Sequence, residues 1–122
     1  SVLFPINFVQ YTDPDYRSKC EQLLQVCRER EVGTMIIKCI TRGPWGDKEQ
    51  TRITWYEPFE KQKMIQAGVN FALSQPVTGI CTVGDPGLLP AVLEACQNYQ
   101  ELSLEEQKDW IEKGDNYQPL FR

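Results

Sequence analysis

The sequence contains no histidine, the side chain that most often serves as a general acid or base and as a metal ligand near neutral pH. Its five cysteines are scattered, and no two stand at CxxC spacing: Cys20, Cys27, Cys39, Cys81 and Cys96. This pattern argues against a zinc site. Because the number is odd and most of the cysteines fall in apolar segments, it favours reduced, buried thiols over a disulfide framework. We therefore expect a cytoplasmic protein without a metal centre.

A basic excess and a long apolar run are also missing. The 13 Lys and Arg residues are outnumbered by 17 Asp and Glu residues, which gives a net charge of −4, and an acidic surface repels nucleic acid and anionic membranes. No apolar run approaches the ~20 residues that span a bilayer. The first eight residues contain Pro5 and Asn7 and have no basic lead, unlike a signal peptide. Neither nucleic acid nor a membrane is expected as a partner.

What is present is the composition of an ordinary globular domain. The 122 residues are 41% hydrophobic and 25% charged, which suits one domain over residues 1–122 with a core of its own. Three mostly apolar, β-prone segments are predicted as strands of a buried parallel sheet: 2–9, 34–40 and 77–83. Helices are predicted between and after them: 13 to about 33, 60–74, 84 to about 96, and 103 to about 114.

Several residues mark the predicted helix ends. Asp13, followed by a proline, is typical of an N-cap and first turn, and Ser103 with Glu106 forms a capping box. Gly114 suits the C-cap of the last helix. Asp85 is either the N-cap of the third helix, which we favour, or a residue beside a bound phosphate.

The order of these elements predicts an α/β fold whose strands are parallel and joined by right-handed crossovers. Three strands make a small sheet with two open edges and one uncovered face, so we expect something else to cover them. Residues 41–58 are predicted as a long loop after the second strand. A long ordered loop at the carboxyl end of a strand is a usual place for function.

Two features near that loop have two interpretations each. Lys38 lies inside an apolar strand, where an ammonium group is costly without a partner. It either contacts a cofactor or carboxylate, or forms a structural ion pair. The aromatic residues Trp45, Trp55 and Tyr56 either wall a substrate pocket or hold the loop in place, and we favour the second.

Three segments resemble the C-terminal part of aldo-keto reductases in sequence and order: 33–46 (GTMIIKCITRGPWG), 55–59 (WYEPF) and 71–77 (FALSQPV). The resemblance runs from Val2 to about Ile111. It is greatest to a bacterial branch in which the seventh barrel strand carries a lysine, as Lys38 does here. It implies that the three strands are similar to strands six to eight of a (β/α)8 barrel. The chain is therefore expected to be a truncated fragment with the fold of a partial TIM barrel.

The family transfers a hydride between a nicotinamide cofactor and a carbonyl, using an aspartate, a tyrosine, a lysine and a histidine on earlier strands. The resemblance therefore implies no catalytic residue in this chain, and Tyr11, Tyr16 and Tyr56 are not given that role. It implies the cofactor-side part of an NAD(P)H-dependent oxidoreductase that is inactive alone. Such a part would act on a nicotinamide dinucleotide and a small carbonyl substrate only when an N-terminal half completes it.

The resemblance assigns cofactor binding to residues that follow the second and third strands: Lys38, Thr41, Arg42, Gly43, Gly84 and Asp85. The family's basic and hydroxyl residues for a 2′-phosphate are replaced here by Asp85, Pro86 and Gly87. Binding of NADP or NAD by this chain alone is therefore expected to be weak or absent.

A function of another class is also open. The chain is then a standalone, non-catalytic binding or assembly module derived from the same fold. We expect such a module to self-associate, because an incomplete barrel exposes strand edges and an apolar face.

Overall fold

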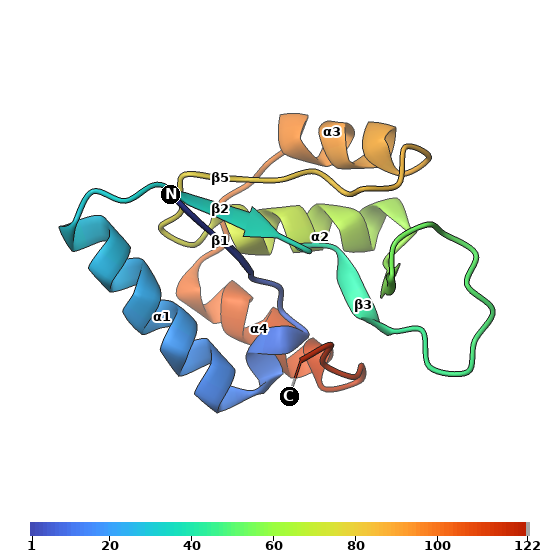
Figure 1. Ribbon diagram of the computed structural model, residues 1–122, viewed down its shortest axis with the longest axis horizontal. Helices are drawn as coiled ribbons and strands as arrows, with labels where there is room; N and C mark the ends of the chain where they lie inside the picture. Colours follow the sequence, from blue (N-terminus) through green and yellow to red (C-terminus); the bar gives the residue numbers. More distant parts are fainter. Residues whose placement is uncertain (122) are drawn as a thin grey trace.

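The computed structural model describes residues 1–121 as a mixed α/β fold (Figure 1). Its strands are β1 Val2–Pro5, β2 Thr34–Ile37, β3 Thr41–Pro44, β4 Tyr56–Pro58 and β5 Gly79–Ile80. Its helices are α1 Pro14–Glu29, α2 Gln62–Leu73, α3 Leu89–Gln97 and α4 Leu104–Gly114, with a 3₁₀ turn at Gln10–Thr12. The predicted α/β class is confirmed, and so is the alternation of strands and helices.

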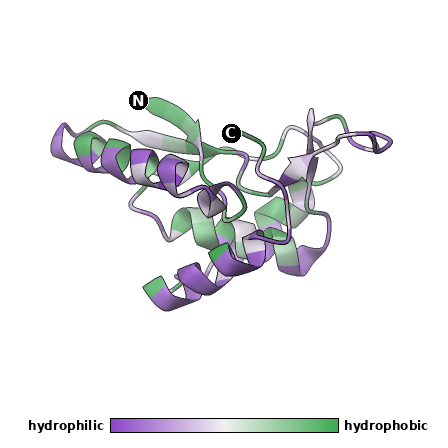
Figure 2. Cartoon of the chain, turned by 90° about the horizontal axis from the view of Figure 1, so that it is seen from below, coloured by the Kyte–Doolittle hydropathy of each residue, from purple (hydrophilic) through white to green (hydrophobic). Residues whose placement is uncertain are grey.

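The main sheet has the strand order β1-β2-β5, and both strand pairs are parallel. Neighbouring strands are connected through helices, as Figure 1 shows. Side chains alternate between the two faces of a sheet. On one face Thr34 and Ile36 are buried, whereas on the other Leu3 is 57% exposed and its neighbour Met35 only half-buried. Within residues 1–121, the helices therefore cover one face and leave the other open. Figure 2 shows the strand at the N-terminus in the hydrophobic colour.

The three strands of this sheet are shorter than predicted. β2 ends at Ile37 and not at residue 40, because Lys38 adopts a left-handed backbone conformation (φ 59°) that turns the chain. β1 ends at Pro5, where the missing N–H is tolerated because β1 is an edge strand. The next residues turn inward, and the Gln10 N–H donates to Asn7 Oδ1 at 2.7 Å. β5 keeps only two residues and pairs with β2 alone.

The prediction of one long loop over residues 41–58 is wrong at both of its ends. The two ends pair as the antiparallel strands β3 and β4, with an irregular register between Thr41 and Gly43. The pairing is continued by a hydrogen bond of 2.8 Å from the Phe59 N–H to the Ile40 carbonyl. Only residues 45–55 remain as a connection.

Two predicted helix ends are confirmed and two are wrong. Asp13 accepts hydrogen bonds from two backbone N–H groups of α1, and Ser103 forms the capping box of α4. Asp85 is not the N-cap of α3, because the helix begins only at Leu89 and the carboxylate instead closes the turn before it. Gly114 is the last residue of α4 rather than its C-cap. A Cβ at this position would lie 2.6 Å from the carbonyl oxygen of Phe8, so close packing requires glycine here.

The core lies between the covered face of the sheet and the helices. α2 is buried on most of its surface and packs against α3 and α4. Phe8 is at the centre, with its ring 5.6 Å from that of Phe59 and 5.2 Å from that of Trp110. Gln10, only 1% exposed, holds the chain end in place through hydrogen bonds of 2.6 and 2.9 Å to the backbone of Phe121.

The cysteines and the helix lengths complete the description. All five cysteines are free; three are buried as predicted, and Cys81 and Cys96 are half-buried. Burial raises the pKa of the Cys39 thiol to about 12, so this thiol serves the core and is not reactive. Among residues 1–121, none of the helices combines the length and the apolar character that a bilayer crossing requires.

Candidate functional site

The carboxyl ends of β2 and β5 open into a cavity of about 320 Å³, which we name the strand-end cavity. Its lining includes Lys38 after β2, Thr82 and Gly84 after β5, and Trp55 from the connection before β4. Parallel strands direct their carboxyl ends to one edge of the sheet, and this edge is where (β/α) folds place their binding sites. Residues more than 40 positions apart in the sequence thus meet here.

Hydrogen bonds to the backbone of Lys38 fix this residue in place, and its side chain extends to the ring of Trp55. Its carbonyl oxygen accepts hydrogen bonds from Asn7 Nδ2 at 3.2 Å and from Thr41 Oγ1 at 2.8 Å, which support the left-handed conformation. Its ammonium nitrogen lies 5.3 Å from the centroid of the Trp55 ring, within the range of a cation–π interaction. None of the carboxylates within residues 1–121 pairs with this ammonium group. Within residues 1–121, the structural ion pair considered for Lys38 is therefore not formed.

The three aromatic residues of the connection have different roles. Trp45 holds the connection in place, because its Nε1–H donates to the Thr54 carbonyl at 2.8 Å. Tyr56 is buried, and burial raises the pKa of its hydroxyl to about 12. Trp55 is 59% exposed and forms a wall of the strand-end cavity. The role of holding the connection is thus confirmed for Trp45, whereas a substrate pocket walled by Trp55 stays a prediction.

Gly84 lines the same cavity, and Asp85 follows it in the chain without lining the cavity. A Cβ on Gly84 would meet no heavy atom within 4 Å, so the backbone is open to a ligand there. Asp85 is buried and turned toward the connection: its carboxylate accepts from the N–H groups of Ile53 at 3.2 Å and Gly87 at 2.8 Å. Burial alone raises the pKa of Asp85, but these hydrogen bonds and the charge of Arg52 outweigh it and lower the pKa overall.

The other predicted cofactor residues lie away from this cavity. Thr41 is 1% exposed, and its hydroxyl is used by the hydrogen bond to Lys38. Arg42 pairs with Glu57 at 3.5 Å and lies over the ring of Tyr117. Gly43 packs against the chain end. The structure thus brings Lys38 and Gly84 together, with Asp85 behind them, and separates them from the residues of β3.

Four lining residues of the strand-end cavity were not predicted from the sequence: Ile37, Ile53, Thr54 and Thr82. Thr82 had a signal that was missed, since a hydroxyl residue at the end of a predicted strand points toward the usual site of an α/β protein. Ile53 had none, because its place depends on the fold of the connection and on its hydrogen bond to Asp85.

The lining residues of the cavity carry one ammonium group, the hydroxyl groups of Thr54, Tyr56 and Thr82, an indole ring and the open backbone of Gly84. These groups suit the binding of a ligand with an anionic part and a flat ring. No group of three or more potential metal ligands occurs within residues 1–121. Comparisons of the chain with protein-family models, with curated proteins and with solved structures gave no match.

Proposed function

We propose that the chain is the cofactor-side, C-terminal part of an aldo-keto-reductase-like, NAD(P)H-dependent oxidoreductase, built as part of a TIM barrel. The observation that carries the proposal is the strand-end cavity. It places the ammonium of Lys38, which has no carboxylate partner within residues 1–121, beside Trp55 and the open backbone of Gly84, at the carboxyl ends of parallel strands. The strands of the main sheet lie in sequential order, β1-β2-β5, and within residues 1–121 helices cover only one of its faces. This arrangement is expected for a segment of a barrel and not for an open sheet that helices cover on both faces.

In this proposal each group of the cavity has a binding role. The ammonium of Lys38 attracts the phosphates of the dinucleotide, and Trp55 offers its ring face to a flat heterocycle. Gly84 allows the backbone to come close to the ligand. The groups that protonate the carbonyl oxygen come from the N-terminal half of the barrel, so the chain alone binds the cofactor weakly at most and does not reduce a carbonyl.

The alternative is a standalone module that self-associates. The specific observation in its favour is the open face of the main sheet, where the apolar side chain of Leu3 is 57% exposed. β1 and β5 also each have one edge without a partner strand among the described residues. Exposed apolar faces and strand edges favour association between copies.

Ligand-observed NMR with NADPH and NADH at millimolar concentration tests the leading proposal. We expect weak binding of the dinucleotide and a loss of affinity of about tenfold in Lys38→Met, since a charged contact is removed. Lys19→Met is the matched control, because Lys19 is an exposed lysine on α1 and does not line the cavity. Equal losses of affinity in the two variants would contradict the proposed role of Lys38. Aldehyde reduction by the chain alone would contradict its assignment as inactive.

A further inference from the structure

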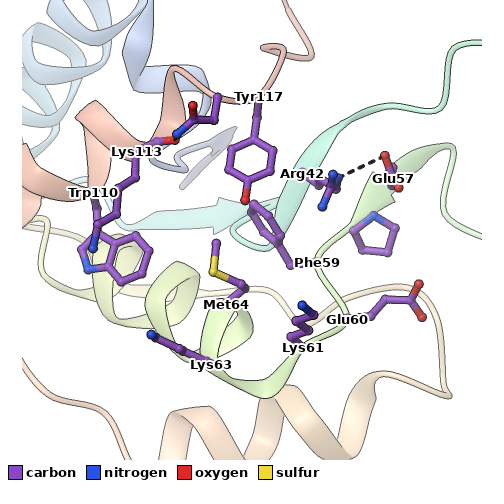
Figure 3. Close-up of a pocket in the computed structure, with 12 residues that line it drawn as sticks. Arg42, Glu57, Phe59, Glu60, Lys61, Lys63, Met64, Trp110, Lys113 and Tyr117 are labelled. Carbon is purple, nitrogen blue, oxygen red and sulfur yellow. Dashed lines mark hydrogen bonds and ion pairs between the residues drawn. The ribbon is translucent and has the colours of Figure 1, made fainter.

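A second, larger cavity of about 570 Å³ lies between the start of α2 and the end of α4 (Figure 3). We name it the α2–α4 cavity. Its apolar lining includes Phe59, Met64, Trp110 and Tyr117, and it shares no residue with the strand-end cavity. The rings of Phe59 and Tyr117 stand nearly perpendicular, with centroids 5.1 Å apart. The cavity therefore has flat apolar walls and a size that accommodates a small organic molecule.

The basic side chains at this cavity are not neutralised. Lys61, Lys63 and Lys113 line it, and within the described part of the chain none of them has a carboxylate within 4.0 Å. The two lining carboxylates are engaged instead by other cations. Glu57 is 2.9 Å from Lys48, and Glu60 is 2.6 Å from Arg52. The cavity is thus locally positive on a protein with a net charge of −4.

The cations lie against the aromatic walls. The ammonium nitrogen of Lys113 is 4.3 Å from the centroid of the Trp110 ring, an arrangement visible in Figure 3. Arg42 lies over Tyr117, with 5.0 Å from Cζ to the ring centroid. A positive charge at the edge of a flat apolar wall matches a molecule with the same two parts, an anionic group and a flat body.

We propose that the α2–α4 cavity binds a small organic anion with a flat apolar body, such as an aromatic carboxylate or sulfonate. The lysines hold the anionic group, and the flat body lies against the walls of Trp110 and Phe59. This proposal does not rest on the proposed oxidoreductase function, since the α2–α4 cavity contains none of the residues that line the strand-end cavity.

Fluorescence titration with 1-anilinonaphthalene-8-sulfonate and with its neutral analogue N-phenyl-1-naphthylamine tests the proposal. We expect tighter binding of the sulfonate, weakened by salt because exposed charges are screened. The variant Lys61→Gln/Lys63→Gln/Lys113→Gln should lose about tenfold or more of that affinity, at about two- to fivefold for each ammonium group. All three side chains are exposed, so the fold is retained, which the thermal unfolding midpoint verifies.

The matched control is Lys19→Gln/Arg30→Gln/Lys108→Gln, which changes the net charge equally at exposed positions outside the cavity. It should bind the sulfonate as the original chain does. Equal losses in the two triple variants would overturn the proposal, because net charge alone would then explain binding. Equal affinity for the charged and neutral probes would also overturn it, and would place the probe on the open apolar sheet face.

Discussion

The two faces of the main sheet are built from the same kind of residue and have opposite environments. Ile36 on the covered face is 0% exposed, whereas Leu3, on the neighbouring strand, is 57% exposed on the open face. Both belong to apolar runs that are typical of a strand buried on both sides. The difference shows that the strands have the composition of a fully enclosed sheet, while residues 1–121 supply the cover for one side only.

The same contrast separates the glycines. Gly68 in α2 faces the turn after β2 so closely that a Cβ would lie 2.6 Å from the Cys39 carbonyl oxygen. A Cβ on Gly79, in β5, would meet only the flexible side chain of Met35, at 3.6 Å. On the covered side, the backbone of α2 at Gly68 packs directly against backbone. On the open side, Gly79 has space for a methyl group.

The largest effect that sharpens this comparison is expected from truncating one apolar side chain on each face. Ile36→Ala should lower the free energy of unfolding by about 2–5 kcal/mol, because it leaves a cavity in a packed core. Leu3→Ala should change it by no more than about 0.5 kcal/mol, as at other exposed sites. Urea denaturation measures both. Similar losses in the two variants would mean that the open face is covered in solution.

A smaller effect is expected at the two glycines. Gly68→Ala should destabilise the chain by about 1–2 kcal/mol net, since overpacking costs about 1–3 kcal/mol and the gain in helix propensity returns up to about 1 kcal/mol. Gly79→Ala serves as the control and should be close to neutral. The midpoints of urea unfolding compare them. A stabilised Gly68→Ala variant would show that α2 does not pack tightly against the turn at Cys39 and Ile40.

The open face also makes a prediction about association. If copies pair through this face, Leu3→Lys should weaken the self-association by about tenfold, or ~1.4 kcal/mol, because a charge would be placed in the interface. Val26→Lys is the control, since Val26 is an apolar residue on α1 that is 44% exposed and lies outside the sheet. Light scattering over a range of concentrations gives the dissociation constants. A monomeric original chain at micromolar concentration would count against the assembly alternative.

The smallest effect concerns acid and the buried carboxylate of Asp85. Its pKa is lowered in the folded state, so its contribution to stability is present above the unfolded value of ~3.9 and is lost as the pH falls through the folded value. The Asp85→Asn variant should therefore lose less stability than the original chain on acidification. Urea unfolding at a series of pH values tests this. Parallel pH profiles of the two proteins would contradict the assignment of these hydrogen bonds to the charged form.

The type of the four helices and of the three strands of the main sheet followed from the sequence because periodicity and capping are local, whereas β3 and β4 were not predicted. Asp13 and Ser103 mark their helices through side chains that bond within three residues, and such contacts need no tertiary structure. Asp85 has the same chemistry, but its carboxylate is shared with Ile53, 32 positions away. That distant partner explains why the N-cap assignment failed there.

The residues of the candidate site likewise fall into those that the sequence indicated and those that depended on tertiary contacts. Lys38 stands out in the sequence as a charge in an apolar run, and Gly84 as a glycine after a strand. The separation of Arg42 from them was not predictable, because it depends on the pairing of β3 with β4 and on the ion pair with Glu57. Both are contacts between segments that are distant along the chain.

By itself the sequence determined the alternation of strands and helices, the helix caps with local partners and the apolar character of the strands. Only the tertiary structure decided where each strand ends, which face of the sheet is covered, and which polar residues share a cavity. The physical reason is that an apolar pattern shows which side chains must be buried but does not show which segment buries them. Strand ends and cavities depend on hydrogen bonds and packing between segments up to tens of residues apart.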